Sequence, residues 1–357
     1  MQRTSMRVCV GGTLLALSAI ARAGDAELAR RADAGPRESY PGVDVEYRAI
    51  TDGAGRRLRF IVTHPHGAPG RLPAVFVAGW LSCDTVEAPP GTRGAAQRVF
   101  QAIAQMPGTA TARLEKAGVG DSEGDCARTD FVAELDGYRR AFQALRSTAF
   151  VNTDRIFIFG LSNGGGFAPL VPEGAPVRGY VVVGGWIKTW FEHMLEIERR
   201  RLALAGHPPS ELNALMKDVE ALYSQYLLEG KAPADIFARA PQLRSLWDGD
   251  PTQQYGRPIS YYQQLQQLDL MQAWSQVGVP LLALHGEFDW IMSRQDLEIM
   301  VAVVNHNAPG SAEFVALPSA GHTFEHVASQ QAAFTGPSLE FDESISRRIV
   351  SWIAQHQ

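Results

Sequence analysis

The pentapeptide G-x-S-x-G, which can present a serine as a nucleophile, occurs twice in this chain, as GLSNG at 160–164 and GDSEG at 120–124. A nucleophilic serine of this kind needs a buried strand directly before it and a helix directly after it. The apolar run 156–159 precedes Ser162, and the glycine-rich stretch NGGGFAPL can begin a helix after it. Ser122 lies in a loop between two carboxylates, which would oppose a developing alkoxide. We therefore predict that Ser162 is the nucleophile; a turn without chemistry is the alternative.

A serine hydroxyl needs a neighbouring base to take its proton, and the base needs a third group to hold it in place. Two later apolar runs end in suitable residues. VPLLALHGEFDW leads to Asp289, and AEFVALPSAGHTF leads to His322. The sequence thus predicts a triad of Ser162, His322 and Asp289, with Glu287 as an alternative acid and His326 as an alternative base.

The elements that must position these residues alternate along the chain. A hairpin is expected between Tyr47 and Pro65, with Asp52 and Gly53 in its turn. Amphipathic helices are expected at 131–149 and from 344 onward, and short strands at 74–78, 109–115, 155–159, 179–183, 280–284 and 313–317. Strands and helices in alternation predict a parallel sheet that is covered on both faces.

The interval 185–278 breaks this alternation. It has helical periodicity and no convincing strand. Structureless loops of such length are uncommon in compact domains, so we expect an inserted helical lid. The core would then consist of two parts, 43–184 and 279–357.

The first residues resemble an export signal. A basic start is followed by an apolar run at 8–21 and a small-x-small site at 21–23, which predicts a signal peptide at 1–23, cleaved near Ala23. The apolar run is too short to span a membrane, and residues 24–42 are expected to form a loose leader. We therefore expect a periplasmic or extracellular protein without a membrane span. The formal net charge of −5 gives no indication of a nucleic-acid partner.

Two cysteines remain after removal of the signal peptide, because Cys9 lies within it. An even number of cysteines in an exported protein favours a disulfide, here between Cys83 and Cys126. Two separate buried thiols are the alternative.

The combination of GLSNG, GEFD and SAGH resembles the α/β-hydrolase family from about Val43 to the C-terminus. The resemblance implies an α/β fold: a mostly parallel central sheet, helices on both faces and an inserted helical lid. It implies the chain order Ser162, Asp289, His322 and an oxyanion hole formed by the backbone amides of Asn163 and Trp80. Related hydrolases often carry His-Gly where this chain has Ala-Gly at 78–79, so the identity of the second amide donor is open. No metal or organic cofactor is implied.

The expected function is that of an exported serine hydrolase that cleaves a small carboxylic ester through an acyl-serine intermediate. The aromatic residues expected to line its substrate pocket are Trp186, Trp190, Tyr261 and Tyr262, with core packing as the alternative. A second hypothesis is an aminopeptidase acting on short peptides, with Glu192 or Glu196 binding the free amine. A third, from another class, is a ligand-binding protein without catalytic activity.

Overall fold

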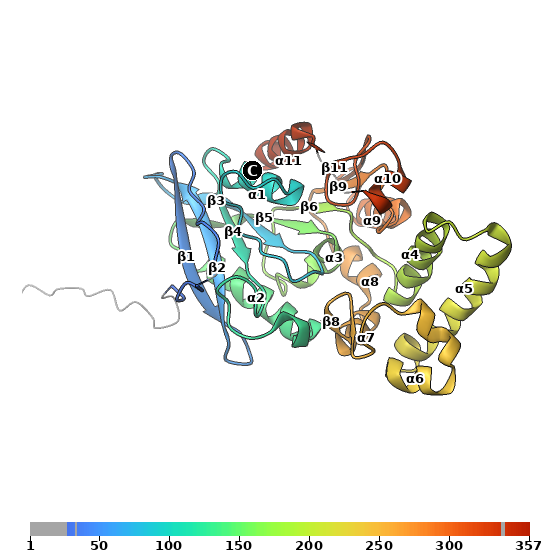
Figure 1. The fold of residues 1–357 in the computed structure, drawn as a ribbon. Helices are drawn as coiled ribbons and strands as arrows, with labels where there is room; N and C mark the ends of the chain where they lie inside the picture. The colour runs from blue at the N-terminus through green and yellow to red at the C-terminus, as the bar shows by residue number, and fades with distance from the viewer. Residues whose placement is uncertain (1–26, 33, 337–339) are drawn as a thin grey trace, which may run out of the picture.

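The computed structural model describes residues 27–32, 34–336 and 340–357, so the predicted signal peptide at 1–23 lies outside the described residues. An eight-stranded sheet forms the centre of the molecule, with the strand order β1-β2-β4-β3-β5-β6-β9-β10 (Figure 1). Its strands are β1 Val43–Thr51, β2 Arg57–Pro65, β3 Leu72–Ala78, β4 Ala110–Leu114, β5 Val151–Leu161, β6 Gly179–Val183, β9 Leu281–Gly286 and β10 Ala312–Leu317. The strands β1 and β2 pair antiparallel, as do β2 and β4, and the other neighbours are parallel. The predicted mostly parallel sheet is confirmed.

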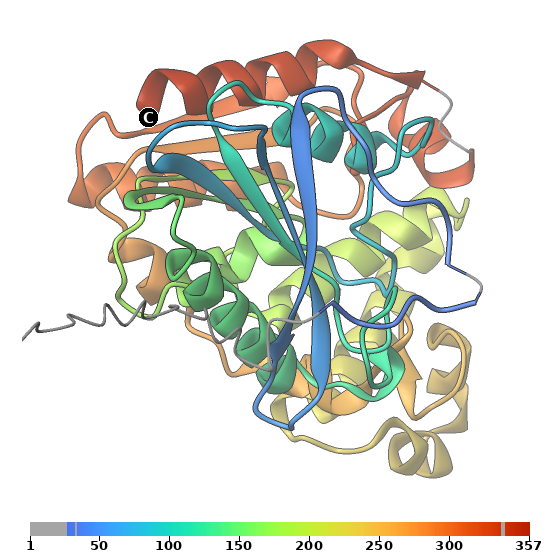
Figure 2. The same cartoon turned by 90° about the vertical axis from the view of Figure 1, so that its left-hand side faces the viewer.

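Helices cover both faces of this sheet, because its central strands carry apolar side chains on both sides. Phe76 and Ile158 belong to the core under α2, whereas their neighbours Val75 and Phe157 belong to the core under α1 and α11. This alternation follows from the two-residue period of a strand. Figures 1 and 2 show α1 and α11 on one side of the sheet and α2 on the other. The covering helices are α1 Ala95–Ala104, α2 Phe131–Arg146, α3 Asn163–Phe167, α8 Leu270–Ser275, α9 Arg294–Asn307 and α11 Glu343–His356.

Helix α2 illustrates how the sequence specifies these covering helices. The carboxylate of Asp130 accepts a hydrogen bond from the N–H of Ala133 and caps the first turn. Phe131, Leu135 and Phe142 follow at helical spacing, and all three are buried against the sheet. The helix therefore has a fixed face toward the core.

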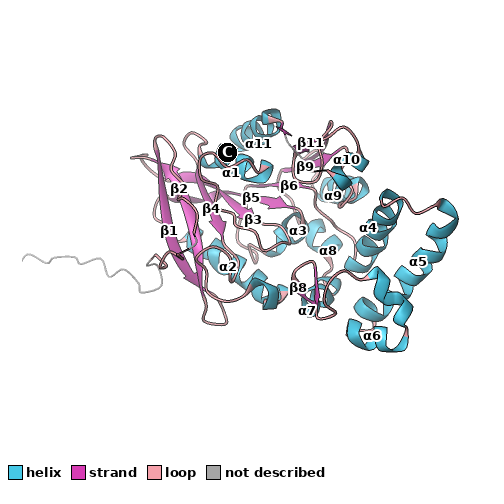
Figure 3. Cartoon of the chain, viewed as in Figure 1, coloured by secondary structure: helices cyan, strands magenta, loops and turns pink. Residues whose placement is uncertain are grey.

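Helices account for most of the chain between β6 and β9, as expected for 185–278. Figures 1 and 3 show α4, α5 and α6 at the end of the molecule away from β1. The segment also contains an antiparallel pair of two-residue strands, which the sequence did not predict because so short a pair shows no alternation. The elements are α4 Trp190–Leu204, α5 Pro209–Tyr223, α6 Pro233–Arg239, β7 Gln253–Gln254, β8 Arg257–Pro258 and α7 Ile259–Gln266. The role of this segment as a lid stays a prediction.

Three short elements follow β10 in the described part of the chain. They are β11 Glu325–His326, α10 Gln330–Thr335 and β12 Glu340–Phe341, and β11 pairs antiparallel with β12. No helix among the described residues is both long and apolar enough to cross a bilayer.

The expectation of a loose segment at 24–42 was wrong for its described part. Glu38 is buried, and its Oε1 accepts a hydrogen bond of 2.7 Å from the buried guanidinium of Arg113 in β4. The backbone N–H of Arg31 donates to Asp121 at 2.9 Å. A polar segment reads as loose from sequence alone, but here it supplies the carboxylate that a buried arginine needs.

Candidate active site

Ser162 occupies a strained turn between β5 and α3. Its φ of 57° and ψ of −121° are rare for a residue with a side chain. Two backbone hydrogen bonds hold the turn: Ser162 N–H donates to Val183 at 2.9 Å, and Gly165 N–H donates to the Ser162 carbonyl at 2.9 Å. The geometry is that of a strand-to-helix turn that presents the serine hydroxyl at the carboxyl edge of the sheet.

The glycines around Ser162 are required by close backbone approach. A Cβ on Gly160 would lie 2.8 Å from the Cα of Gly165, inside van der Waals contact. A Cβ on Gly164 would collide with the backbone carbonyls of Ala78 and Gly79. Glycine at these positions therefore lets the loop after β3 lie directly against the turn that carries Ser162.

The structure brings the three predicted triad residues together. The Ser162 hydroxyl lies 2.8 Å from Nε2 of His322, and Nδ1 of His322 lies 2.8 Å from Oδ2 of Asp289. The other carboxylate oxygen of Asp289 accepts the backbone N–H groups of Ile291 and Met292 at 2.8 and 2.9 Å. Each residue follows a different strand, namely β5, β9 and β10, so the carboxyl edge of the parallel sheet assembles the group.

Asp289 and His322 shift each other's pKa in opposite directions. Burial alone would raise the pKa of Asp289, but His322 and the N–H of Met292 hold that pKa below its usual value. Burial would lower the pKa of His322, but the Asp289 carboxylate outweighs it and raises that pKa above 6.5. Asp289 thus stays ionised, and His322 becomes a stronger base than a free imidazole.

The alternative residues are used elsewhere. Glu287 accepts the backbone N–H of Ser319 at 2.9 Å and so shapes the loop that carries His322. His326 is exposed in β11. Ser122 is fully buried, and its hydroxyl donates to a backbone carbonyl at 3.1 Å. None of the three side chains has a hydrogen bond to Ser162, His322 or Asp289 among the contacts of the described residues.

Trp80 and Asn163, the predicted amide donors, both line the cavity that contains Ser162. Asn163 is the first residue of α3, where a backbone N–H has no partner within the helix. Its side chain is fixed by two hydrogen bonds, to the hydroxyl of Tyr261 at 2.9 Å and from the indole of Trp186 at 3.1 Å. The indole of Trp80 stacks on Phe100, with the ring centroids 5.6 Å apart. The role of both amides as oxyanion donors stays a prediction.

A cavity of about 680 Å³ opens above Ser162 and His322, within the usual size of small-molecule sites. Trp190 lines it, as predicted. The prediction for Trp186, Tyr261 and Tyr262 was wrong, because these three are fully buried outside the described lining of the cavity. Their polar atoms bond to other parts of the protein: Trp186 to Asn163, Tyr261 to Glu134, and Tyr262 to the carbonyl of Gln254.

Several cavity residues were missed in the sequence. His193, Met194 and Ile197 join Trp190 on one face of α4. Their spacing of three and four residues was the available signal, but it does not say whether a helix faces a core or a cavity. Burial, followed by the positive charges of Arg200 and Lys188, lowers the pKa of His193 to about 3, so its imidazole is neutral.

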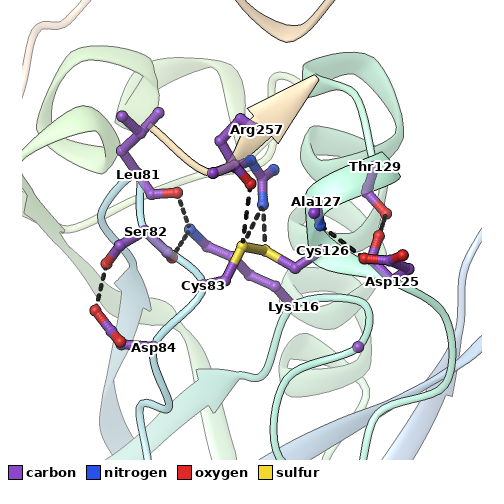
Figure 4. Close-up of a disulfide and its surroundings, with 12 residues drawn as sticks. Leu81, Ser82, Cys83, Asp84, Lys116, Asp125, Cys126, Ala127, Thr129 and Arg257 are labelled. Atoms are coloured by element: carbon purple, nitrogen blue, oxygen red, sulfur yellow. Dashed lines mark hydrogen bonds between the residues drawn. A yellow bond between two sulfur atoms is a disulfide. The ribbon is translucent and has the colours of Figure 1, made fainter. Parts of the chain in front are cut away.

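The predicted disulfide between Cys83 and Cys126 is present and joins the loop after β3 to the loop after β4 (Figure 4). The guanidinium of Arg257, from β8, lies against both sulfur atoms, with Nη1 3.6 Å from that of Cys83. The bridge therefore lies where the two loops meet the segment inserted between β6 and β9.

Reduction of this disulfide is expected to destabilise the protein, because it frees two loops that the bridge constrains. Loss of a native bridge commonly costs about 2 to 5 kcal/mol, so the melting temperature should fall in dithiothreitol. Calorimetry with and without the reductant measures this, and a Cys83→Ala/Cys126→Ala variant, insensitive to dithiothreitol, is the control. Quantitative alkylation of both thiols in the unreduced, denatured protein would contradict the bridge.

No cluster of three or more histidine, cysteine, aspartate or glutamate side chains suited to a metal ion occurs within 27–32, 34–336 and 340–357.

Comparisons with known proteins identify the fold. No family model matches the sequence, and no curated protein matches it. Among solved structures, Est1E from Butyrivibrio proteoclasticus with ferulic acid bound is 16% identical, with a TM-score of 0.56 over 87% of this chain and 98% of that one. The esterase PF2001 from Pyrococcus furiosus is 13% identical, with a TM-score of 0.52 over 90% and 96%. The α/β hydrolase GrgF from Penicillium sp. sh18 is 18% identical, with a TM-score of 0.51 over 88% and 99%. Together with the observed strand order, these likenesses show that the chain has the α/β-hydrolase fold.

Proposed function

We propose that this protein is an exported serine hydrolase that cleaves carboxylic esters through an acyl-serine intermediate. The observation that carries the proposal is the unbroken hydrogen-bonded chain from Ser162 through His322 to Asp289 at the wall of a cavity. The likeness to Est1E and to the esterase PF2001 supports an ester as the substrate. The predicted signal peptide and the disulfide support export.

In the proposed reaction, Ser162 Oγ attacks the ester carbonyl while Nε2 of His322 takes its proton. The same proton passes to the alcohol oxygen as the C–O bond breaks, which leaves the acyl group on Ser162. Water then attacks the acyl carbon, with His322 as base, and releases the acid and free Ser162. Asp289 keeps the proton of His322 on Nδ1 and stabilises the imidazolium.

The tetrahedral intermediates carry a negative oxygen, which the backbone N–H groups of Asn163 and Trp80 would stabilise. Each such donor is worth about 3 to 4 kcal/mol in the transition state. The close approach that Gly164 permits places the loop after β3 beside Ser162, as such an arrangement needs.

The cavity lining favours an ester with an apolar or aromatic group. Trp190, Tyr255 and Trp290 contribute aromatic rings, and Met194 and Ile197 add apolar surface. Two charged residues also border the cavity: Arg201, which pairs with Glu198, and Asp84.

The two carboxylates expected to bind a substrate amine in the aminopeptidase alternative, Glu192 and Glu196, have other partners. Glu192 caps α4 through Thr189, and Glu196 pairs with Lys188. Neither carboxylate is among the described residues that line the cavity.

A panel of p-nitrophenyl esters of increasing acyl length, assayed beside aminoacyl p-nitroanilides on the purified mature protein, tests the proposed bond. We expect the esters to be hydrolysed faster. Faster hydrolysis of the anilides would favour the aminopeptidase instead. If neither class turns over and no serine-directed probe labels the protein, it is a binding protein without catalytic activity.

The pH dependence of kcat/KM should show an acid limb that belongs to His322. Protonated imidazole cannot accept the Ser162 proton, so activity is lost at low pH and rises as His322 becomes neutral. Because Asp289 raises the pKa of His322, the limb should have its midpoint above 6.5. Steady-state rates on a non-ionising ester measure this, and a rate that does not change through the acid range would contradict the role of His322.

A further inference from the structure

Lys116 is a buried lysine whose ammonium group is engaged entirely within the protein. It lies just after β4, and its side chain is 4% exposed. Its Nζ donates hydrogen bonds to three consecutive backbone carbonyls, those of Trp80, Leu81 at 3.1 Å and Ser82 at 2.9 Å. Figure 4 shows the contacts with Leu81 and Ser82. An ammonium group has three N–H donors, so each donor has one acceptor in this loop.

These carbonyls belong to residues 80–82, the segment that would supply the second oxyanion donor and that forms part of the cavity wall. The C=O and N–H of a planar trans peptide point in opposite directions. Holding these three carbonyls toward one point turns the N–H groups of residues 81–83 away from it and fixes the chain directly after Trp80, whose own N–H belongs to the preceding peptide group. We propose that Lys116 is a positioning residue: it fixes the peptide groups that directly follow Trp80 and thereby holds residue 80, with its N–H, in place in the oxyanion hole. The inference rests on the acyl-transfer function proposed above.

Glu134 connects this arrangement to the other side of the site. Its Oε1 lies 3.6 Å from Nζ of Lys116 and accepts the hydroxyl of Tyr261 at 3.1 Å, and its Oε2 pairs with Arg257. The hydroxyl of Tyr261 in turn accepts the side-chain amide of Asn163 at 2.9 Å. One carboxylate thus contacts the groups that hold both proposed donors, and it connects them to the segment inserted between β6 and β9.

The ammonium group of Lys116 should lose its proton within the pH range in which the enzyme can be assayed. Burial lowers its pKa to about 8. The carboxylates of Glu134 on α2 and Asp84 in the loop after β3 raise this pKa. The positive charge of Arg257 on β8 lowers it further. The neutral amine has only two donors for three carbonyls. As the pH rises through about 8, Lys116 loses a proton and should hold the carbonyls of segment 80–82 less firmly. We therefore expect kcat to fall in this range.

The test is the dependence of kcat and KM on pH, from about pH 6 to about pH 10, for the mature protein and three variants. Lys116→Met should lower kcat at neutral pH by about 10- to 100-fold, change KM by less than about threefold, and abolish the alkaline limb. Glu134→Gln should move that limb to lower pH, because it removes the charge that stabilises the ammonium. Lys188→Met is the matched control, since Nζ of Lys188 pairs with Glu196 and lies outside the described lining of the cavity. It should keep the wild-type limb.

Several results would overturn the inference. A packing defect in Lys116→Met would raise KM or lower the melting temperature and leave the alkaline limb intact. That result would count against positioning. If that variant does not fold, the curves of wild type and Glu134→Gln decide: an alkaline limb of the same midpoint in both overturns the proposal. Wild-type protein that neither hydrolyses esters nor reacts with a fluorophosphonate would instead overturn the proposed function, and this inference with it.

Discussion

Replacing Ser162 with alanine is expected to lower kcat on p-nitrophenyl esters by about 10⁴-fold or more, because no other group can form the acyl intermediate. The fold should survive, since the turn is held by backbone hydrogen bonds of Ser162 and by glycines rather than by the hydroxyl. Steady-state turnover measures the loss, and circular dichroism with a melting curve checks the fold.

The chain offers a matched control in its second G-x-S-x-G pentapeptide. Ser122→Ala removes a hydroxyl that donates to the Glu115 carbonyl and accepts the N–H of Arg59. This substitution should lower the melting temperature and leave kcat within about threefold of wild type, because it removes a buried hydrogen bond of the kind worth about 1 kcal/mol. Equal losses in the two variants would contradict the assignment of Ser162.

Asp289→Asn is expected to lower kcat by about 10⁴-fold with little change in structure. The carboxylate accepts a hydrogen bond from Nδ1–H of His322, which keeps the proton on Nδ1 and leaves Nε2 free to accept the serine proton. An asparagine N–H donor facing Nδ1 would favour the other tautomer, in which Nε2 carries the proton. Ester turnover of this variant, with the crystal structure or melting curve as a check of folding, measures the effect.

Glu287→Gln is the control for that substitution, because Glu287 is the other acid near the end of β9. A glutamine oxygen can still accept the N–H of Ser319, so the loop carrying His322 should keep its shape. We expect kcat within about threefold of wild type, in line with substitutions that leave the reacting groups in place. A larger loss for Glu287→Gln than for Asp289→Asn would reverse the two assignments.

The sequence predicted those parts of the site that depend on local pattern. An apolar strand, a serine and three glycines follow one another within 156–166, and the close contacts at Gly160 and Gly164 explain why no other residue type fits there. Asp289 and His322 likewise follow directly on the apolar runs of β9 and β10. The parallel sheet then brings the three strand ends to one edge without further information from the sequence.

The parts that sequence could not predict depend on partners far apart in the chain. Tyr261, an aromatic residue of the inserted segment, was expected in the cavity, yet its hydroxyl donates a hydrogen bond to Glu134, 127 positions away. Lys116 resembles a surface lysine, yet its acceptors are backbone carbonyls in 80–82 that no residue type reveals. Glu38 pairs with Arg113 across 75 positions, which turned an apparently loose segment into a packed one. Periodicity indicates that a side chain is buried, but not which buried group it meets.

The most direct test of the proposed function is the site of covalent labelling. Purified mature protein is treated with a fluorophosphonate, digested, and analysed by mass spectrometry to locate the modified residue. The proposed mechanism predicts one adduct per chain, on the peptide that contains Ser162, and no adduct in Ser162→Ala. An adduct on Ser122 or any other residue, or labelling that persists in Ser162→Ala, would contradict it.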